Sequence, residues 1–289
     1  MGLFAVFQTS LSGISLAETA LDVGANNLAN LSTPGFKASR VVAATQTPQT
    51  QSRGSGPTGP EGGTNPVQVG LGAYVAAIEV DASQGAIELT GDPAQLALQG
   101  QGLFILQGRD GGRTYTRDGR FALNADDELV AGDGSSVLGF GVGADGEIDT
   151  TQLRPLKIKL GSFIATPAGS ASLLGYSVTP TGRIKGRYSD GQWRNLGQLR
   201  LVRFPNPAGL EQRGGNRYVE GPASGAALET DPGGVAAATI LPGAIERSNT
   251  DVGRELVNSL LWDMHFRANV AVSTTAGSLL GELLSLRRA

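Results

Sequence analysis

The C-terminal segment after Arg247 constrains the fold of this chain more than any other, because it reads as one long helix. The run Ser248–Asp251 offers N-cap side chains, Glu255 places an acid in the first turns, and Arg287 with Arg288 places base in the last turn. These signals predict a helix of about 36 residues, on the order of 54 Å long.

The apolar residues of this helix follow an 11-residue repeat that forms a stripe along it. It consists of Val257, Leu261, Met264, Ala268, Val272, Thr275, Leu279, Leu283 and Leu286. Such a period favours nearly straight or slightly right-handed packing. Further apolar residues lie off the stripe: Leu256, Leu260, Trp262, Phe266, Val270, Leu280 and Leu284. A helix that is apolar on more than one side must be surrounded, and one partner helix cannot do this, so the pattern predicts neighbouring copies.

The N-terminal segment predicts a second helix, because no proline occurs between Leu3 and Leu31. Its apolar residues Phe7, Ile14, Leu21 and Leu28 recur every seven positions, with Phe4, Leu11 and Ala25 at companion positions. This spacing is typical of a helix that packs on another helix. Pro34 ends it, since proline disfavours helix at the preceding residue.

The middle of the chain differs from both ends. Residues 46–66 are rich in Gln, Thr, Pro, Gly and Ser without an apolar period, which by composition is typical of a linker. From 67 to 245 short alternating runs are separated by turn residues, which predicts an antiparallel β domain. The expected strands include 103–106, 120–123, 128–130, 175–178 and 198–202, and the expected turns are at Asp110-Gly111, Asp145-Gly146, Thr181-Gly182 and Asp190-Gly191.

Composition excludes several classes of site. The 289 residues include no cysteine and one histidine, which excludes disulfides, a cysteine nucleophile and a Cys/His metal centre. The net charge of −3 lacks the positive excess that is typical of nucleic-acid-binding proteins. No apolar run approaches the roughly 20 residues of a membrane span, and no Lys or Arg precedes Lys37, so neither membrane insertion nor a cleaved secretory signal is expected.

Individual polar groups also lack a catalytic pattern. No phosphate-binding loop is present, and the acidic run 126–128 is expected to be a turn between strands. His265 lies in the long helix and is expected to be a buried or interface residue. Arg117 and Asp118 are expected to form a surface pair at a hairpin. We therefore expect no enzymatic activity, no cofactor and no metal.

The segment 21–37, LDVGANNLANLSTPGFK, is the most specific motif. Asn26, Asn27 and Asn30 cost helix propensity, and buried amides need partners, so they are expected to make hydrogen bonds at an interface or cap. The segment resembles the N-terminal signature of the axial proteins of the bacterial flagellum, the rod and hook proteins. Its elements match at Asp22, Val23, Asn26, Asn27, Ala29, Asn30, Thr33, Gly35, Phe36 and Lys37.

Two further blocks resemble the same family. Residues 96–104 with 115–121 are similar to its β-domain motif, and 248–251 with 255–258 and the closing Leu283, Leu286 and Arg287 resemble its C-terminal helix. The chain departs from the family where a Gln-Arg pair is replaced by Asp263-Met264, and where an Asp is replaced by Gly277. The family's subunit contacts can therefore be transferred to this chain least safely in this part of the helix.

The fold expected from these features is α+β. Long N- and C-terminal helices, within residues 1–40 and 246–289, would form a coiled-coil layer, and a mainly antiparallel β domain at 67–245 would be inserted between them. The tract 41–66 would connect the two. In this family the corresponding region joins the core helices to the β domain, so the tract is expected to become ordered only in the assembly, by packing against neighbouring subunits. Such order would have to come from backbone pairing and from Val41, Val42, Val67 and Val69.

The resemblance implies a structural subunit of the flagellar axis that assembles helically into a tube, transmits torque and conducts exported subunits. Its partners would be further copies, adjacent rod, hook or hook-junction proteins, and the type III export apparatus, and its place the basal-body rod or the hook, reached without a cleaved signal peptide. The missing outer domain favours a rod protein, whereas 183–189 and 196–199 resemble the hook version, so both stay open. The alternatives are a secreted adhesive or binding module and a β-rich cell-wall enzyme.

The residues expected at the assembly interface come from both terminal segments. From the first they are Phe7, Leu11, Ile14, Leu21, Asn26, Asn27, Leu28, Asn30 and Phe36, and from the second Leu256, Val257, Leu261, Met264, Leu279, Leu283 and Leu286.

Overall fold

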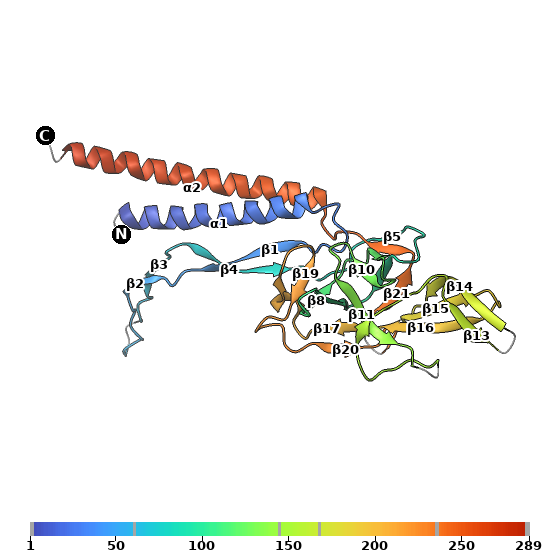
Figure 1. Cartoon of the computed structure of the whole chain (residues 1–289). Coiled ribbons are helices and arrows are strands. Elements are labelled where there is room, and N and C mark those ends of the chain that lie inside the picture. Colours follow the sequence, from blue (N-terminus) through green and yellow to red (C-terminus); the bar gives the residue numbers. More distant parts are fainter. Residues whose placement is uncertain (1–2, 60–61, 144–145, 167–168, 235–236, 287–289) are drawn as a thin grey trace. The chain divides into compact units, whose positions relative to one another are not determined.

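The computed structural model describes residues 3–59, 62–143, 146–166, 169–234 and 237–286 (Figure 1). It divides the chain into two compact units. The helical unit comprises Met1–Ala29, Ser39–Val80 and Asp251–Ala289, and the β unit comprises Asn30–Ala38 and Asp81–Thr250. This division differs from the expected segments: residues 67–80 belong with the helices, whereas 30–38 and 246–250 belong with the β unit.

Both expected helices are present. α1 spans Leu3–Ala29 and α2 spans Val252–Leu286. Asp251 caps α2, since its carboxylate Oδ1 accepts the backbone N–H of Arg254 at 3.1 Å and its carbonyl accepts that of Glu255 at 2.9 Å. The chain is thus α+β, with terminal helices and mainly antiparallel strands between them.

A long β-hairpin completes the helical unit. β1 (Ser39–Thr45) pairs with β4 (Ala73–Val80), β2 (Gln49–Ser52) pairs with β3 (Val67–Val69), and a bridge joins Ser55 to Thr64. Much of the Gln- and Gly-rich tract therefore lies in paired strands, and Pro60 and Glu61 lie outside the described residues. The four valines flanking the tract all pair: Val41 with Ile78, Val42 with Ala77, Val67 with Ser52 and Val69 with Gln49.

α1 lies between α2 and the β1–β4 hairpin (Figure 1). The hairpin approaches α1 closely at Gly72, where a methyl group in place of hydrogen would lie 2.1 Å from Oγ of Ser12. Gly72 also has a φ of +101°, so glycine is required there by both space and backbone conformation. The helical unit is therefore layered as α2, α1 and hairpin.

The β unit is built on one large antiparallel sheet and two smaller strand pairs. The main path of the large sheet is β13-β14-β15-β16-β11-β7-β8-β19-β18. Its strands are β7 (Leu103–Gln107), β8 (Arg113–Thr116), β11 (Ser136–Gly141), β13 (Phe163–Thr166), β14 (Gly169–Val178), β15 (Arg183–Tyr188), β16 (Trp193–Leu199), β18 (Glu211–Gln212) and β19 (Arg217–Val219).

Shorter strands branch from this path or pair beside it. β10 (Leu129–Ala131) joins β11 to β9 (Phe121–Leu123), β12 (Arg154–Pro155) adds to β11, and β17 (Leu201–Arg203) joins β7 to β20 (Leu228–Thr230). β6 (Leu96–Gln99) pairs with β21 (Thr239–Pro242), and β5 (Ile87–Leu89) pairs with β22 (Ala244–Glu246). Pro207–Gly209 form a 3₁₀ turn.

The expected strand and turn positions are largely confirmed. Strands occur at 103–106, 121–123, 129–130 and 175–178, and turns connect strands at Asp110-Gly111, Thr181-Gly182 and Asp190-Gly191. The expected strand 198–202 is divided between β16 and β17, because the chain leaves one strand partner for another at Arg200. Of the turn at Asp145-Gly146, Asp145 lies outside the described residues.

The β unit has its own apolar core. Leu96, Leu98, Phe104, Leu106, Leu199 and Leu201 are almost inaccessible to solvent. Phe104 packs edge-on against Phe121, with ring centroids 5.0 Å apart. A second cluster around Ile105, Tyr115 and Phe204 packs on the other face of β7. Burial on both faces of this central strand explains its continuous run of large apolar residues.

Candidate assembly site

Most of the fully buried positions of α1 are small residues. Along α1 the buried positions are Ser10, Ala17, Ala20, Gly24 and Asn27, and Gly13 belongs to the same 3-4 spacing. A methyl group on Gly13 would lie 2.5 Å from Oδ1 of Asn269, and one on Gly24 would lie 3.3 Å from Oγ of Ser259. We call these six residues the small-residue seam. It lets the two helices approach closely, since their separation is set by side-chain size at the contact.

The helices run antiparallel. Asn27, near the end of α1, is bonded to Glu255, near the start of α2, with 3.3 Å between Nδ2 and Oε1. Further along, Gly13 lies beside Asn269, and Phe7 lies beside Gly277. The pairing therefore spans nearly all of α1.

Asn27 is the buried amide of the signature. Its Oδ1 accepts the backbone N–H of Ser39 at 2.9 Å, and its Nδ2 donates to the Ser39 carbonyl at 2.8 Å. Together with the bond to Glu255, these contacts join α1, α2 and the start of β1 at one point. Asn30 ends the helix: its Oδ1 accepts from Thr33 Oγ1 at 3.1 Å. The expected hydrogen bonding is thus observed for both side chains, and Asn26 is exposed.

The 11-residue repeat from Val257 to Leu286, which we call the α2 stripe, lies on the exposed side of its helix. Of the described residues of α2, only Ala276 is buried. Large apolar side chains are half or more exposed, at 56% for Val257, 50% for Leu261, 66% for Met264, 50% for Leu279, 55% for Leu283 and 74% for Leu286. Leu256, off the stripe, is also 51% exposed. α2 therefore presents one face to α1 and a second, more apolar face outward.

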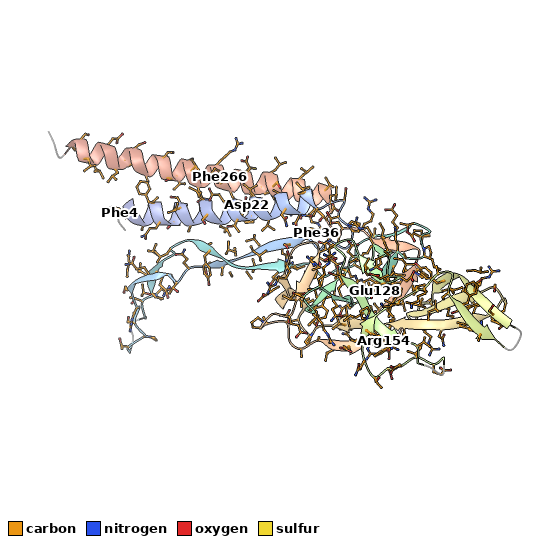
Figure 2. All side chains as sticks on the ribbon, viewed as in Figure 1. Phe4, Asp22, Phe36, Glu128, Arg154 and Phe266 are labelled. Atoms are coloured by element: carbon orange, nitrogen blue, oxygen red, sulfur yellow. The ribbon has the colours of Figure 1, made fainter. Side chains whose placement is uncertain are left out.

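The large apolar residues of α1 flank its small-residue seam. Phe7, Ile14, Leu21 and Leu28 are half-buried, and Leu11 is 65% exposed. Phe4, at the N-terminal end of α1 (Figure 2), is 78% exposed. Sequence reasoning from large apolar residues missed the seam. The signal was available as small residues at positions 10, 13, 17, 20, 24 and 27, a heptad pattern offset from the leucines.

Lys37, the last residue of the signature, meets a buried carboxylate in the β unit. Glu246 is buried and accepts hydrogen bonds from Nζ of Lys37 at 2.6 Å, Nε of Arg117 at 2.5 Å and the backbone N–H of Gly85 at 2.9 Å. The other Arg117 donors reach the carbonyls of Leu98, Gly100 and Gly102 at 2.6–3.0 Å. We call Lys37, Arg117 and Glu246 the charge cluster. It ties the first two sequence blocks that resembled the family to Glu246, two residues before the third.

The prediction that Arg117 and Asp118 form a surface pair is wrong. Arg117 points inward to the charge cluster, and Asp118 instead bonds Arg120 at 2.9 Å. The chain can turn there because Gly119 leaves room: a methyl group on it would lie 1.6 Å from the Leu96 carbonyl oxygen. Local sequence placed the two charges side by side, but the turn sends them to opposite sides.

The segment 34–38 is fixed by the same region. Gly35 has a φ of +69° and donates its N–H to the Glu246 carbonyl at 2.8 Å, and Phe36 is buried. Asn249 bonds the N–H of Ala38 at 2.8 Å and the carbonyl of Asp81 at 2.9 Å. Burial lowers the pKa of Lys37, with Glu246 opposing that shift. Two buried cations thus share one carboxylate.

The described parts of the chain contain no group of three or more His, Asp or Glu residues arranged to hold a metal ion. Asp126, Asp127 and Glu128 form the expected turn, between β9 and β10. His265 is exposed beside Trp262, with ring centroids 5.4 Å apart, so its expected burial is not observed within the subunit. Within the same residues, no helix is long and apolar enough to cross a membrane.

Comparison with known proteins identifies the family. The family model "Flagella basal body rod protein" matches residues 7–37, and "Flagellar hook protein FlgE/F/G D1 domain" matches residues 97–186. The flagellar basal-body rod protein FlgG of Bacillus subtilis is 33% identical over 281 residues, covering 97% of this chain and 98% of the relative. The chain belongs to the flagellar rod and hook protein family. It is a structural protein of the flagellar axis.

Other relatives match over different lengths. FlgG of Buchnera aphidicola subsp. Schizaphis graminum is 32% identical over 279 residues, covering 96% of this chain and 97% of the relative. The flagellar hook protein FlgE of Borreliella burgdorferi is 42% identical, but only over 42% of this chain and 27% of the relative. The solved structure of Helicobacter pylori FlgE2 covers 61% of this chain and 46% of that protein, at 13% identity and a TM-score of 0.23.

Proposed function

We propose that this chain is a rod subunit that polymerises through the α2 stripe. The single observation that carries the proposal is the exposure of that stripe on a helix whose opposite face is already occupied by α1. An exposed apolar patch of this extent marks an interaction surface. The α2 stripe of one copy packs against helices of neighbouring copies, and the polymer transmits torque around a central channel.

The stripe supplies the energy that the small-residue seam does not. Burying apolar surface contributes about 25 cal/mol per Å². Within one subunit, the fully buried side chains of α1 and α2 are Asn27 and small ones such as Ala17 and Ala276, whereas Leu261, Met264 and Leu283 stay exposed. The coiled-coil layer expected from the sequence is therefore proposed between subunits. Its 11-residue period favours nearly straight packing.

The match in length favours a rod subunit over a hook subunit. This chain and its FlgG relatives match over nearly their whole lengths, whereas the hook relative matches over 27% of its own length. A hook protein carries much sequence that this chain lacks. The basal-body rod is thus the proposed location.

The proposed partners follow from this location. They are further copies of the chain, the adjacent rod, hook or hook-junction proteins, and the flagellar type III export apparatus. A helical unit that buries few large side chains is easily unfolded, which suits export through a narrow channel. Assembly then completes the packing of both helices.

A pair of charge substitutions on the α2 stripe tests the proposal. Leu261→Glu with Met264→Glu is expected to abolish polymer formation, because it puts two carboxylates into the proposed apolar contact. Since both side chains are half or more exposed, the monomer is expected to keep its fold, with a change in unfolding free energy of about 0.5 kcal/mol or less. Sedimentation against protein concentration measures assembly, and circular dichroism measures folding.

The matched control is Thr274→Glu with Ser278→Glu. It adds the same charge to α2 at exposed positions outside the stripe. The control is expected to assemble like the unmodified chain. Normal assembly and motility of the stripe variant would refute the proposal, and so would equal loss in both variants.

A further inference from the structure

The outer face of strands β13–β16 exposes large apolar side chains that the β unit does not cover. Phe163 is 74% exposed, Leu174 is 64% exposed and Trp193 is 53% exposed. Other large apolar residues of these strands, such as Leu173 and Ile184, are buried on the opposite face. The exposure is therefore specific to one side of this part of the sheet.

Strand register places these side chains on one face. Phe163 pairs with Ser172, two residues before Leu174. Leu173 pairs with Tyr188 and both are buried, so their strand neighbours Ser172 and Arg187 lie on the exposed face. Trp193 pairs with Arg187 and therefore shares that face with Phe163. Leu174 is the extra residue at a register shift between Leu173 and Gly175, and its exposure places it on the same side.

The same face carries cations without acidic partners. Arg183, Lys185 and Arg187 alternate along β15, and within the described part of the chain none of them forms an ion pair. Elsewhere in the β unit most arginines are paired, as are Arg120, Arg154 and Arg200. We call Phe163, Leu174, Arg183, Lys185, Arg187 and Trp193 the basic face. Its chemistry fits an acidic protein surface.

This chain carries an excess of acid in the neighbouring part of its sequence. Residues 121–153 contain seven Asp or Glu and no Lys or Arg, whereas residues 155–198 contain six Lys or Arg and one Asp. Some of these charges are used internally, as in the pairs of Glu128 with Lys157 and Asp149 with Arg154. The opposite charges of the two segments are thus only partly satisfied within one subunit.

The acidic turn between β9 and β10 is the best-placed complement. Asp126 is exposed and Asp127 is half-buried, and neither forms an ion pair among the described residues. The turn is held by Asn124, whose Oδ1 accepts the backbone N–H groups of Asp126 at 2.9 Å and Glu128 at 2.8 Å. The carboxylates are therefore presented on a preorganised backbone, which lowers the entropic cost of binding.

We propose that the basic face of one subunit binds the acidic turn of a second copy. Asp126 and Asp127 pair with cations of β15, and Phe163, Leu174 and Trp193 become covered at the contact. Because the two surfaces differ, the contact is heterologous and leaves a free basic face and a free acidic turn at the ends, so it can propagate. This inference extends the proposed polymer by a contact between β units, independent of the α2 stripe.

Site-directed cross-linking tests this contact, since the chain has no cysteine of its own. Full-length Arg187→Cys and Asp126→Cys proteins are mixed and treated with a short bismaleimide. Lys185, Arg183 and Asp127 remain to hold the contact. The matched control mixes Arg187→Cys with Asp110→Cys, an exposed acid in the turn between β7 and β8. The test pair is expected to give about fivefold more heterodimer than the control, and less in high salt.

A charge exchange gives an independent readout. Two double variants are made, one with Lys185→Glu and Arg187→Glu, the other with Asp126→Lys and Asp127→Lys. Each is expected to raise the concentration needed for assembly about tenfold. An equimolar mixture restores assembly in part, because it recreates opposite charges at half of the contacts. Arg109→Glu with Arg213→Glu, two exposed arginines outside the basic face, controls for net charge.

The outcomes separate this inference from the proposed function. Polymers that form without selective cross-linking overturn the contact and leave the α2 stripe intact. Selective cross-linking without polymers supports the contact and overturns the α2-driven assembly. Loss of assembly that the mixture does not rescue means that the basic face binds another partner, which also overturns the inference.

Discussion

The two units place their large apolar side chains in opposite ways. In the β unit, Leu96, Phe104 and Leu199 are inaccessible, and their burial stabilises the unit from within. In the helical unit the buried positions are small, as at Ala17, and Met264 is 66% exposed. From this difference we expect the β unit to be stable on its own, and the helical unit to gain stability from the proposed polymer contacts.

Charged side chains also differ between the two units: they are buried in the β unit and exposed in the helical unit. The charge cluster of the β unit is buried and satisfied by fixed carbonyls and one carboxylate. In the helical unit the ion pairs are exposed, as between Arg40 and Glu79, and such pairs contribute about 0–1 kcal/mol. We therefore expect two unfolding transitions, with the helical unit melting first in the monomer.

The largest expected effect is on the charge cluster. Glu246→Gln removes the carboxylate shared by Lys37 and Arg117 and leaves two buried cations without an anion. We expect it to lower the unfolding free energy of the β unit by about 3–5 kcal/mol. Because Trp262 lies on α2, both proteins carry Trp262→Phe, which leaves Trp193 as the fluorescent tryptophan. Urea denaturation followed by tryptophan fluorescence then measures the change, and helix content measures the other unit.

Asp118→Asn is the control for this substitution, because it removes a carboxylate from the exposed pair with Arg120. A loss of about 1 kcal/mol or less is expected. If Glu246→Gln lowered the unfolding free energy no more than this control, the charge cluster would not stabilise the β unit. The contrast between buried charges in one unit and exposed ion pairs in the other would then have no energetic meaning.

A smaller effect is expected at alkaline pH, again in the β unit. Burial raises the pKa of Tyr218 to about 12, from an ordinary value of 10.0. Between these values the unfolded chain has lost a proton that the folded chain retains, so stability falls as pH rises through that window. Tyr218 is buried, and the loss from this group is roughly 2 kcal/mol by pH 12.

Tyr218→Phe isolates this contribution. Tyr115, whose pKa is also raised by burial and by its hydrogen bond to Glu220, is present in both proteins. The variant should therefore lose less stability than the unmodified chain above pH 10, with little difference at pH 7. Parallel pH curves for the two proteins would show that the hydroxyl of Tyr218 is hydrated.

The smallest expected effect is a gain, in the helical unit. Gly277→Ala should stabilise α2 by up to about 1 kcal/mol, because glycine is a poor helix former. Space allows it, since the added methyl group would only touch Cζ of Phe7, at 3.9 Å. Monomer helix content by circular dichroism should rise, and the β transition should stay unchanged. A shift in the β transition would show that the units do not unfold separately.

Periodicity and turn chemistry predicted the elements well. Both helices, the N-cap at Asp251 and most strands and turns followed from local sequence, because each depends on nearby residues. The Gln-rich tract shows the limit of composition. Its residues have no apolar period, yet many of them pair in a hairpin, because backbone hydrogen bonds need no particular side chain.

The assembly site was only partly predictable. The α2 stripe was visible as a period, but a period alone does not say which face of a helix meets its partner in the same chain. That depended on the glycines and alanines of α1, which accept close contact with Asn269 and Ser259. The basic face on β13–β16 depended on strand register, which brings Phe163 and Trp193 to one side.

The sequence by itself determined the family, the terminal helices and the antiparallel character of the middle, since motifs, periods and turns are local properties. Only the tertiary structure decided that Lys37, Arg117 and Glu246 meet, 80 and 129 residues apart along the chain. The physical reason is that a buried charge is tolerated only where partners from distant segments are brought within hydrogen-bonding distance, and that placement is a property of the whole fold.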